Sequence, residues 1–389
     1  MKRLLLPLLF GATLNANELE NFLSPTYNEL FDTELKKSFA QSKYNSLSWI
    51  SPVTLGFERS WSNQIEGGWH PRNSYSIGIE QPIFKSGGIF YGIKYAKSNY
   101  SLAKATTIGQ KVKLNTQAHE LVLQIKQLKL SIAKLKLQIK NAKIEIKRAK
   151  ELFDAGLFSS VELDNALIKK DEANIALFDL EANLANLIAA FKKVSNKDIN
   201  SIKLPKVRLL SKDEFLANNI EIEIAKAKRQ SSKNYAKMVR SKYLPTVSLG
   251  ARYTKISNAQ PHTKDAFTNY SLKVSMPISV NTSNDLEVAK LDSIIDGIKI
   301  KNTKIAQSID YDTTLKRVKS IEQKIAIANK QIKAYKRLYK STNEQYKAGQ
   351  KSIDDVNLIK NSLKIKKLDK YIYTYAKSIE ILKLYEKVR

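Results

Sequence analysis

The chain has no cysteine among its 389 residues, and it has only three histidines. The missing cysteine excludes disulfides, thiol catalysis, cysteine-ligated metals and a lipid on an N-terminal cysteine. His70, His119 and His262 have no neighbour at metal-ligand spacing, and His119 is expected to be an ordinary helix residue. The sequence also has no phosphate-binding loop and no nucleophile elbow. We therefore expect no enzyme, no cofactor and no metal site.

Long apolar runs are missing as well. After the N-terminus, no stretch reaches the roughly 18 consecutive apolar residues that a membrane-spanning helix needs. The N-terminus carries Lys2 and Arg3, then a short apolar core from Leu4 to Phe10, then small or polar residues up to Ala16. This order is typical of a secretory signal peptide, predicted over residues 1–16 with cleavage after Ala16. The mature chain is therefore expected to be exported.

Acidic residues are few relative to basic ones. There are 37 Asp and Glu against 66 Lys and Arg, which gives a net charge of +29. Such a charge can indicate binding to nucleic acid or to an anionic surface. The basic residues are instead spread along helical segments, without a basic–aromatic RNA motif or zinc-finger spacing. We interpret them as the solvated faces of long helices and expect no nucleic-acid partner.

The segment from Leu114 to Phe153 has the clearest pattern in the chain. Its apolar residues recur at steps of three and four, which predicts a helix packed along a long seam. A second apolar line repeats every seventh residue on another side, so we expect neighbours on both flanks. Gly156 is the expected residue just past the helix end, and Glu162 lies in the first turn of the next helix. The members of the two lines are Ala118, Leu121, Ile125, Leu128, Ile132, Leu135, Ile139, Ala142, Ile146 and Ala149, and Leu123, Leu130, Leu137 and Ile144.

Apolar and polar residues alternate with period two over about 51–61 and 73–83, separated by a polar loop. Strands of about ten residues with one apolar face fit a membrane β-barrel. A soluble hairpin with one face on a core fits the same pattern, and these strands alone do not decide between the two.

The second half of the chain repeats the first. Pro245-Thr-Val-Ser-Leu-Gly echoes Pro52-Val-Thr-Leu-Gly, and the interval between these segments is nearly the same as the interval from Gly156 to Gly349. Such a constant spacing indicates a duplicated unit. The predicted organisation is a first repeat over 17–194 with a hairpin tip at 153–160, a linker over 195–211, and a second repeat over 212–389 with strands at about 245–255 and 268–278 and a tip at 346–353. Helices are also expected at about 27–44 and, unbroken, at about 212–242.

Four strands per chain are too few to close a membrane barrel, which begins at about eight strands. If the strands cross a membrane, several chains must share one barrel, and three chains would give twelve strands. The fold that we predict, in line with the resemblance described below, is mainly α with membrane β. It has a long α-helical coiled-coil tunnel plus four strands per chain that form a shared trimeric twelve-stranded barrel. The residues expected to face lipid are Val53, Leu55, Phe57, Ile77, Ile79, Val247, Leu249, Leu272 and Val274.

These features together resemble the TolC-type outer-membrane efflux proteins, also called outer membrane factors. The resemblance rests on four features: the duplicated unit, the Leu-Pro-Thr-Val-Ser-Leu segment at 244–249, the Pro-Ile near the end of each second strand, and the two aromatic-x-Ala-Gly tips. The resemblance implies a homotrimer in the cell outer membrane with a periplasmic helical domain. It also implies an exit duct, serving a tripartite efflux pump or a type I secretion system, that meets a periplasmic adaptor and an inner-membrane pump. The alternative is a periplasmic coiled-coil adaptor or structural protein, which should instead have lipoyl-like segments around one hairpin.

The resemblance also implies two sets of site residues. The expected gate consists of Glu162, Tyr346, Lys351 and Asp355, with Leu358 where the family has a second acid. The plainer interpretation of Glu162 and Asp355, as first-turn acids favoured by the helix dipole, stays open. The tips expected to dock on an adaptor comprise Gly156, Leu157, Ser159, Gly349, Gln350 and Ser352.

Overall fold

The computed structural model describes residues 19–63, 68–202, 207–257 and 264–389. The predicted signal peptide, residues 1–16, lies outside the described residues. Seven helices and four strands follow one another in the described part of the chain. They are α1 (Pro25–Leu47), β1 (Thr54–Ser62), β2 (His70–Phe84), α2 (Gly88–Asp154), α3 (Ser160–Val194), α4 (Lys212–Ala217), α5 (Ile220–Lys242), β3 (Thr246–Ser257), β4 (Ala266–Ser275), α6 (Thr282–Lys347) and α7 (Ile353–Tyr385).

The chain forms two compact units, and both halves of the sequence contribute to each. The strand-bearing unit comprises residues 30–108 and 220–306. The hairpin unit comprises residues 19–29, 109–219 and 307–389. Apart from α4, the elements of the second half occur in the same order as those of the first, as the duplicated pattern predicts.

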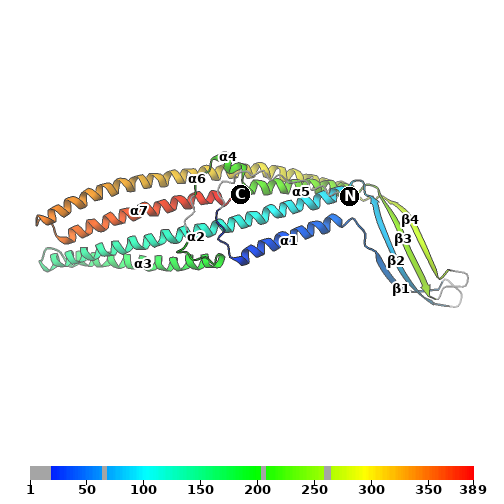
Figure 1. Ribbon diagram of the computed structural model, residues 1–389, viewed down its shortest axis with the longest axis horizontal. Helices are drawn as coiled ribbons and strands as arrows, with labels where there is room; N and C mark the ends of the chain where they lie inside the picture. The colour runs from blue at the N-terminus through cyan, green and yellow to red at the C-terminus, as the bar shows by residue number, and fades with distance from the viewer. Residues whose placement is uncertain (1–18, 64–67, 203–206, 258–263) are drawn as a thin grey trace, which may run out of the picture. The chain divides into compact units, whose positions relative to one another are not determined.

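The strand-bearing unit contains one antiparallel sheet with the strand order β1-β2-β3-β4 (Figure 1). Each hairpin comes from one half of the chain, and the pairing of β2 with β3 joins the two halves. Strand β2 begins at His70, earlier than the predicted residue 73. Its first residues still pair with β1, since Pro71 lies opposite Trp61. A register shift between Pro82 and Phe84 ends the regular pairing of β2 with β3.

One face of this sheet is apolar, and it carries the strand residues predicted to face lipid. Residues directly opposite in neighbouring strands share a face. The register pairs Leu55 with Ile77, Leu249 with Leu272, and Val247 with Val274. Successive residues of a strand point to opposite faces, so the alternate positions form the other face. That face is small or polar, with Ser76, Gly78, Glu80, Ser248, Gly250, Thr254, Ser271 and Lys273.

The helix predicted without a break over 212–242 is wrong. The structure has α4 and α5 instead, separated at Asn218 and Asn219. The backbone N–H of Asn218 donates to the carbonyl of Glu214 and closes α4. Asn219 then forms an isolated antiparallel bridge with Val388, and its side chain donates to Gln307 Oε1 at 3.2 Å. Partners far away in the sequence therefore override the helical pattern at this point.

In the hairpin unit, the two apolar lines of α2 pack on different neighbours, as predicted. Ala118 and Ile125, both fully buried, lie in one cluster with Phe191 of α3 and with Phe22. Leu123, 1% exposed, lies in a second cluster with residues of α6 and α7, including Val318 and Leu382. Two separate stripes let one helix bury side chains on both flanks at once.

His119 joins the N-terminal segment to α2. Its ring is 1% exposed, stacks on Phe22 at 3.7 Å between centroids, and bonds the carbonyl of Glu20 through Nε2 at 2.7 Å. Asn115, one turn earlier, accepts from the Phe22 backbone N–H at 2.8 Å. Burial lowers the pKa of His119, while the Glu20 carbonyl acts in the opposite direction. The ring therefore packs as a neutral core group of the helix.

Candidate functional site

The two hairpin tips have the same backbone geometry. Gly156 has φ +72° and Gly349 has φ +76°, so both occupy the left-handed region that glycine adopts without strain. Leu157 N–H reaches back to Leu152 O at 2.8 Å, and Gln350 N–H reaches Gln345 O at 2.9 Å. These bonds satisfy the last carbonyls of α2 and α6.

The predicted gate acids cap the helices that follow the tips. The backbone N–H of Ser159 donates to Glu162 Oε2 at 3.0 Å, and the Ser159 hydroxyl also donates to this oxygen. At the second tip, Ser352 N–H donates to Asp355 Oδ2 at 3.0 Å, and Asp355 N–H donates back to Ser352 Oγ at 3.1 Å. These reciprocal bonds are capping boxes. They lower the pKa of Glu162, mainly through the Ser159 hydroxyl.

Asp355 has a further partner that the sequence did not suggest. Arg148 Nη2 lies 2.5 Å from Asp355 Oδ1, and Lys147 Nζ lies 2.8 Å from Asp354 Oδ2. Both ion pairs join α2 of the first hairpin to α7 of the second. The Ser352 backbone N–H, with its hydroxyl and Arg148, lowers the pKa of Asp355 to about 2. This carboxylate is therefore ionised at any pH near neutral.

The other predicted gate residues do not meet within one chain. Tyr346 is 40% exposed at the end of α6, and Lys351 is exposed in the turn after it. Among the described residues, no ion pair joins Glu162 to Lys351. Near the tips of one chain, the structure instead links the two hairpins through Arg148 and Lys147. The sequence has basic residues one to two turns before the first tip, but no local pattern indicates which acids of the other hairpin they face.

Large apolar side chains are exposed at both tips. Leu157 is 71% exposed and Phe158 39%, while Ile353 is 49% exposed at the second tip. The predicted docking residues Ser159 and Ser352 lie beside them as helix caps. The tips thus combine a rigid turn with an uncovered apolar surface, which marks interaction sites on proteins.

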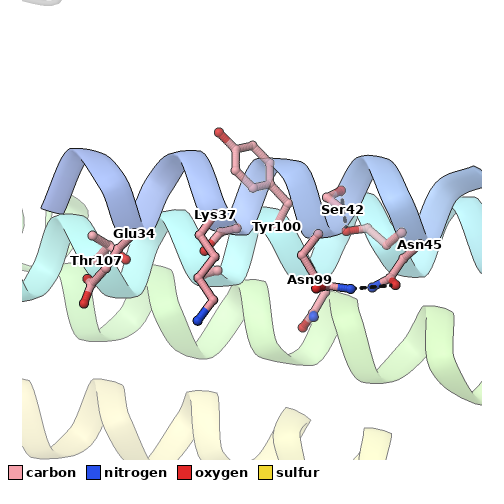
Figure 2. Close-up of a pocket in the computed structure, with 11 residues that line it drawn as sticks. Glu34, Lys37, Ser42, Asn45, Asn99, Tyr100 and Thr107 are labelled. Carbon is pink, nitrogen blue, oxygen red and sulfur yellow. Dashed lines mark hydrogen bonds between the residues drawn. The ribbon is translucent and has the colours of Figure 1, made fainter. Parts of the chain in front are cut away.

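A separate groove of about 310 Å³ lies between α1 and α2 in the strand-bearing unit (Figure 2). Figure 2 shows Lys37 and Asn99 projecting on the same side from the two helices. Its hydrogen bonds are structural: Ser42 Oγ donates to Ala96 O at 3.0 Å, and Gln41 donates to Asn45 at 3.0 Å. Its lining has no nucleophile paired with a base, so this groove gives no indication of catalysis.

Within the residues that the structure describes, no group of His, Asp and Glu side chains is arranged to hold a metal ion. Over the same residues, no helix is both long and apolar enough to cross a bilayer.

The fold matches a set of solved outer-membrane proteins. The outer membrane protein VceC of Vibrio cholerae matches with a TM-score of 0.72 at 11% identity, over 93% of both chains. CusC, described for its transmembrane channel formation, matches with a TM-score of 0.72 at 13% identity, over 96% of this chain and 94% of its own. The CmeC outer membrane channel of Campylobacter jejuni gives 0.71 at 17% identity, over 97% and 91%. The fold is therefore that of the outer-membrane channels.

Residues 51–196 match the family described as outer membrane efflux protein. A comparison with curated proteins gave no match. The resemblance inferred from the sequence is confirmed: residues 51–196 match this family, and the chain has the fold of the outer-membrane channels over nearly its whole length. The predicted fold class is confirmed with it: the chain is mainly helical and contributes four antiparallel strands.

Proposed function

We propose that this chain is the exit duct of a tripartite efflux pump or a type I secretion system, and that it conducts substrates passively to the exterior. The observation that carries this proposal is the four-stranded sheet with one apolar and one polar face, combined in one chain with two capped helical hairpins. A lipid-facing apolar surface and a polar inner surface are what a water-filled membrane barrel needs.

The duct is proposed to be a homotrimer. Strands β1 and β4 are the edges of the sheet, and each has one unpaired side in the chain. Open edges are not tolerated in hydrocarbon, because unpaired backbone groups there cost several kcal/mol each. Helix α6 adds a second argument, since an exposed apolar stripe at heptad spacing is suited to another copy of the chain. The stripe consists of Val288, Leu291, Ile295, Ile298 and Ile305, which are 58%, 45%, 46%, 52% and 59% exposed.

The tips are proposed to dock on a periplasmic adaptor that connects to an inner-membrane pump. Gly156 and Gly349 fix the turns, and Leu157, Phe158 and Ile353 supply apolar contact area. A short, rigid, partly apolar tip is favourable for docking because little conformational entropy is lost on binding.

The same end of each hairpin is proposed to hold the gate. Glu162, Tyr346, Lys351 and Asp355 form it by resemblance, and Arg148 and Lys147 add links between the two hairpins. Partly exposed ion pairs are individually weak, at about 0–1 kcal/mol. Repetition around a trimer would let several such pairs act on one aperture, which opens when they separate.

Membrane fractionation and planar-bilayer recording test the proposal together. The full chain should sediment with the outer membrane as a heat-modifiable trimer, and the purified trimer should form discrete channels. A protein that fractionates with the soluble periplasm and gives no conductance would instead support the adaptor interpretation.

A further inference from the structure

A second groove, of about 390 Å³, lies in the strand-bearing unit where the sheet joins the helices. Its lining comes from the end of α1 and the following Trp49, from Lys85 directly after β2, from the start of α2, from the end of α5, and from Thr246 at the start of β3. Strands β1 and β3 begin at this end of the sheet, and β2 and β4 end there. The groove therefore lies where the strands connect to helices.

The groove is cationic. Its lining includes Lys85 and Lys242 but no aspartate or glutamate. The acids of the neighbouring segments have other partners. Glu80 pairs with Lys273 at 3.3 Å, and Asp285 accepts a hydrogen bond from the Tyr243 hydroxyl at 2.7 Å. The two lysines thus retain their charge for an external anion.

The serine hydroxyls near the two lysines are not available to bind that anion. The Ser48 hydroxyl donates to Asn45 O at 2.8 Å, and the Ser241 hydroxyl donates to Met238 O at 2.6 Å. Because these hydroxyl protons are already engaged, recognition of an anion rests on the lysines. The carbonyl of Trp49 accepts from the Gln81 amide at 3.1 Å, which holds the tryptophan backbone at the rim of the sheet.

Two aromatic residues of α2, which lie in the sequence between Ile89 and Gly92 of the groove lining, have cations near their rings. Lys94 Nζ lies 4.2 Å from the ring centroid of Phe90, and Lys237 Nζ lies 5.0 Å from that of Tyr91. Tryptophan, tyrosine and basic residues together are typical of the membrane–water interface. The apolar sheet face reaches the same end, where Val247 pairs with Val274.

We propose that this groove binds the phosphate of an anionic glycerophospholipid in the leaflet nearest the helices. The inference rests on the proposed function, because it requires the apolar sheet face to contact acyl chains. The Lys85 and Lys242 ammonium groups bind the phosphate oxygens, and Trp49 lies at the glycerol level. The acyl chains then extend along the apolar face. A phosphate bound at this depth ties the ends of β2 and α5 to one lipid molecule, in the way that basic pockets bind lipid headgroups.

Native mass spectrometry of the purified full-length assembly in detergent tests the proposal, with dioleoyl phosphatidylglycerol, dioleoyl phosphatidylcholine and inorganic phosphate as three separate probes. Phosphatidylglycerol should bind more tightly than phosphatidylcholine. The double variant Lys85→Gln/Lys242→Gln should bind phosphatidylglycerol about 30-fold more weakly, as expected for two surface lysines. Lys85→Arg/Lys242→Arg should retain binding. The matched control Lys290→Gln/Lys301→Gln removes the same charge from exposed positions of α6 and should leave binding unchanged.

Equal binding of the two lipids, or equal loss in the control variant, would overturn the assignment. Binding of inorganic phosphate as tight as that of phosphatidylglycerol would reject the lipid and leave only a phosphate site. Bilayer recording on the same preparations separates this inference from the proposed function. Channels with no lipid preference reject the inference alone, whereas a wild-type chain that forms no channels rejects the proposed function.

Discussion

Arg148 of α2 and Asp355 of α7 join the two hairpins of one chain, with Nη2 and Oδ1 2.5 Å apart. The two residues are 207 positions apart in the sequence. Asp355 also caps α7, so the same carboxylate fixes a helix start and a contact between hairpins.

Breaking this pair should loosen the proposed gate. Arg148→Ala should raise single-channel conductance in planar bilayers, while trimers still reach the outer membrane. The two side chains are 48% and 23% exposed, so the expected loss of stability is only about 0.2–1 kcal/mol. Lys150→Ala, at an exposed position two residues further along α2, is the control and should leave conductance unchanged. Identical conductance for Arg148→Ala and wild type would remove Arg148 from the gate.

The effect of Asp355 should not depend on pH near neutrality. The pKa of Asp355 is held at about 2 in the folded chain, below its ordinary value. The stability that the ionised carboxylate gives to the fold is therefore fully present when the pH is above that ordinary pKa, and it is lost only as the pH falls toward 2. Asp355→Ala should weaken block by multivalent cations from the periplasmic side equally at pH 5.5 and pH 8. If the effect of Asp355→Ala on the block changed between these two pH values, the cation site would belong to another group.

Glu162 and Lys351 test the gate at the level of the assembly. The double variant Glu162→Ala/Lys351→Ala should raise conductance if these residues meet between hairpins of the trimer. Glu162→Ala alone also removes the cap of α3, so Ser159→Ala is the matched control for capping. Equal conductance in the double variant and in Ser159→Ala, with intact trimers, would leave capping as the role of Glu162.

The tip glycines should tolerate no bulky residue. Gly156→Val and Gly349→Val force a β-branched side chain into the left-handed region, at a cost of about 1–3 kcal/mol each. We expect loss of efflux, measured as drug susceptibility, with trimers still in the outer membrane. Gly92→Ala inside α2 is the control, because its added Cβ would approach only Met238 Sδ, at 3.9 Å. Full resistance in the tip variants would show that tip geometry is irrelevant to docking.

The two faces of the sheet should respond differently to charge. Leu249→Arg on the apolar face should destabilise the assembly by about 2–4 kcal/mol if the residue lies near the bilayer midplane. Ser271→Arg, on the small and polar face, should be tolerated. Heat-modifiability gels on outer-membrane fractions compare the two, and equal tolerance would argue against lipid contact on the Leu249 face.

His119 should make the contact between the N-terminal segment and α2 sensitive to acid. Its pKa is lowered by burial in the folded chain, so the unfolded segment binds a proton more readily and stability falls as the pH drops through the ordinary value near 6.5. Glu20 and Lys197 are the charged groups that act on the ring. Hydrogen exchange at the Phe22 amide should therefore speed up between pH 7.5 and pH 5.5, after correction for intrinsic rates. His119→Gln should abolish this change, and the exposed His70→Gln should not.

Much of this fold was predictable because its signals are local. The heptad steps of α2 predict both of its buried lines, and Gly156, Ser159 and Glu162 specify a turn and a capping box within a few residues. The break at Asn218 was not predictable, because the next residue, Asn219, pairs with Val388 and Gln307, far along the chain. Arg148 was missed for the same reason: no local pattern tells an arginine which helix will lie across from it.

The pairing of β2 with β3 has a consequence for the order in which the protein folds. Phe84 pairs with Val247, so this ladder closes a loop that contains α2, α3, α4 and α5. Contacts of such large sequence separation form slowly, because the entropy of loop closure must be overcome first. Each helical hairpin closes through a tip of a few residues and can form early. The sheet is therefore completed late, and its apolar face is assembled only after the helices that precede β3 have emerged and folded.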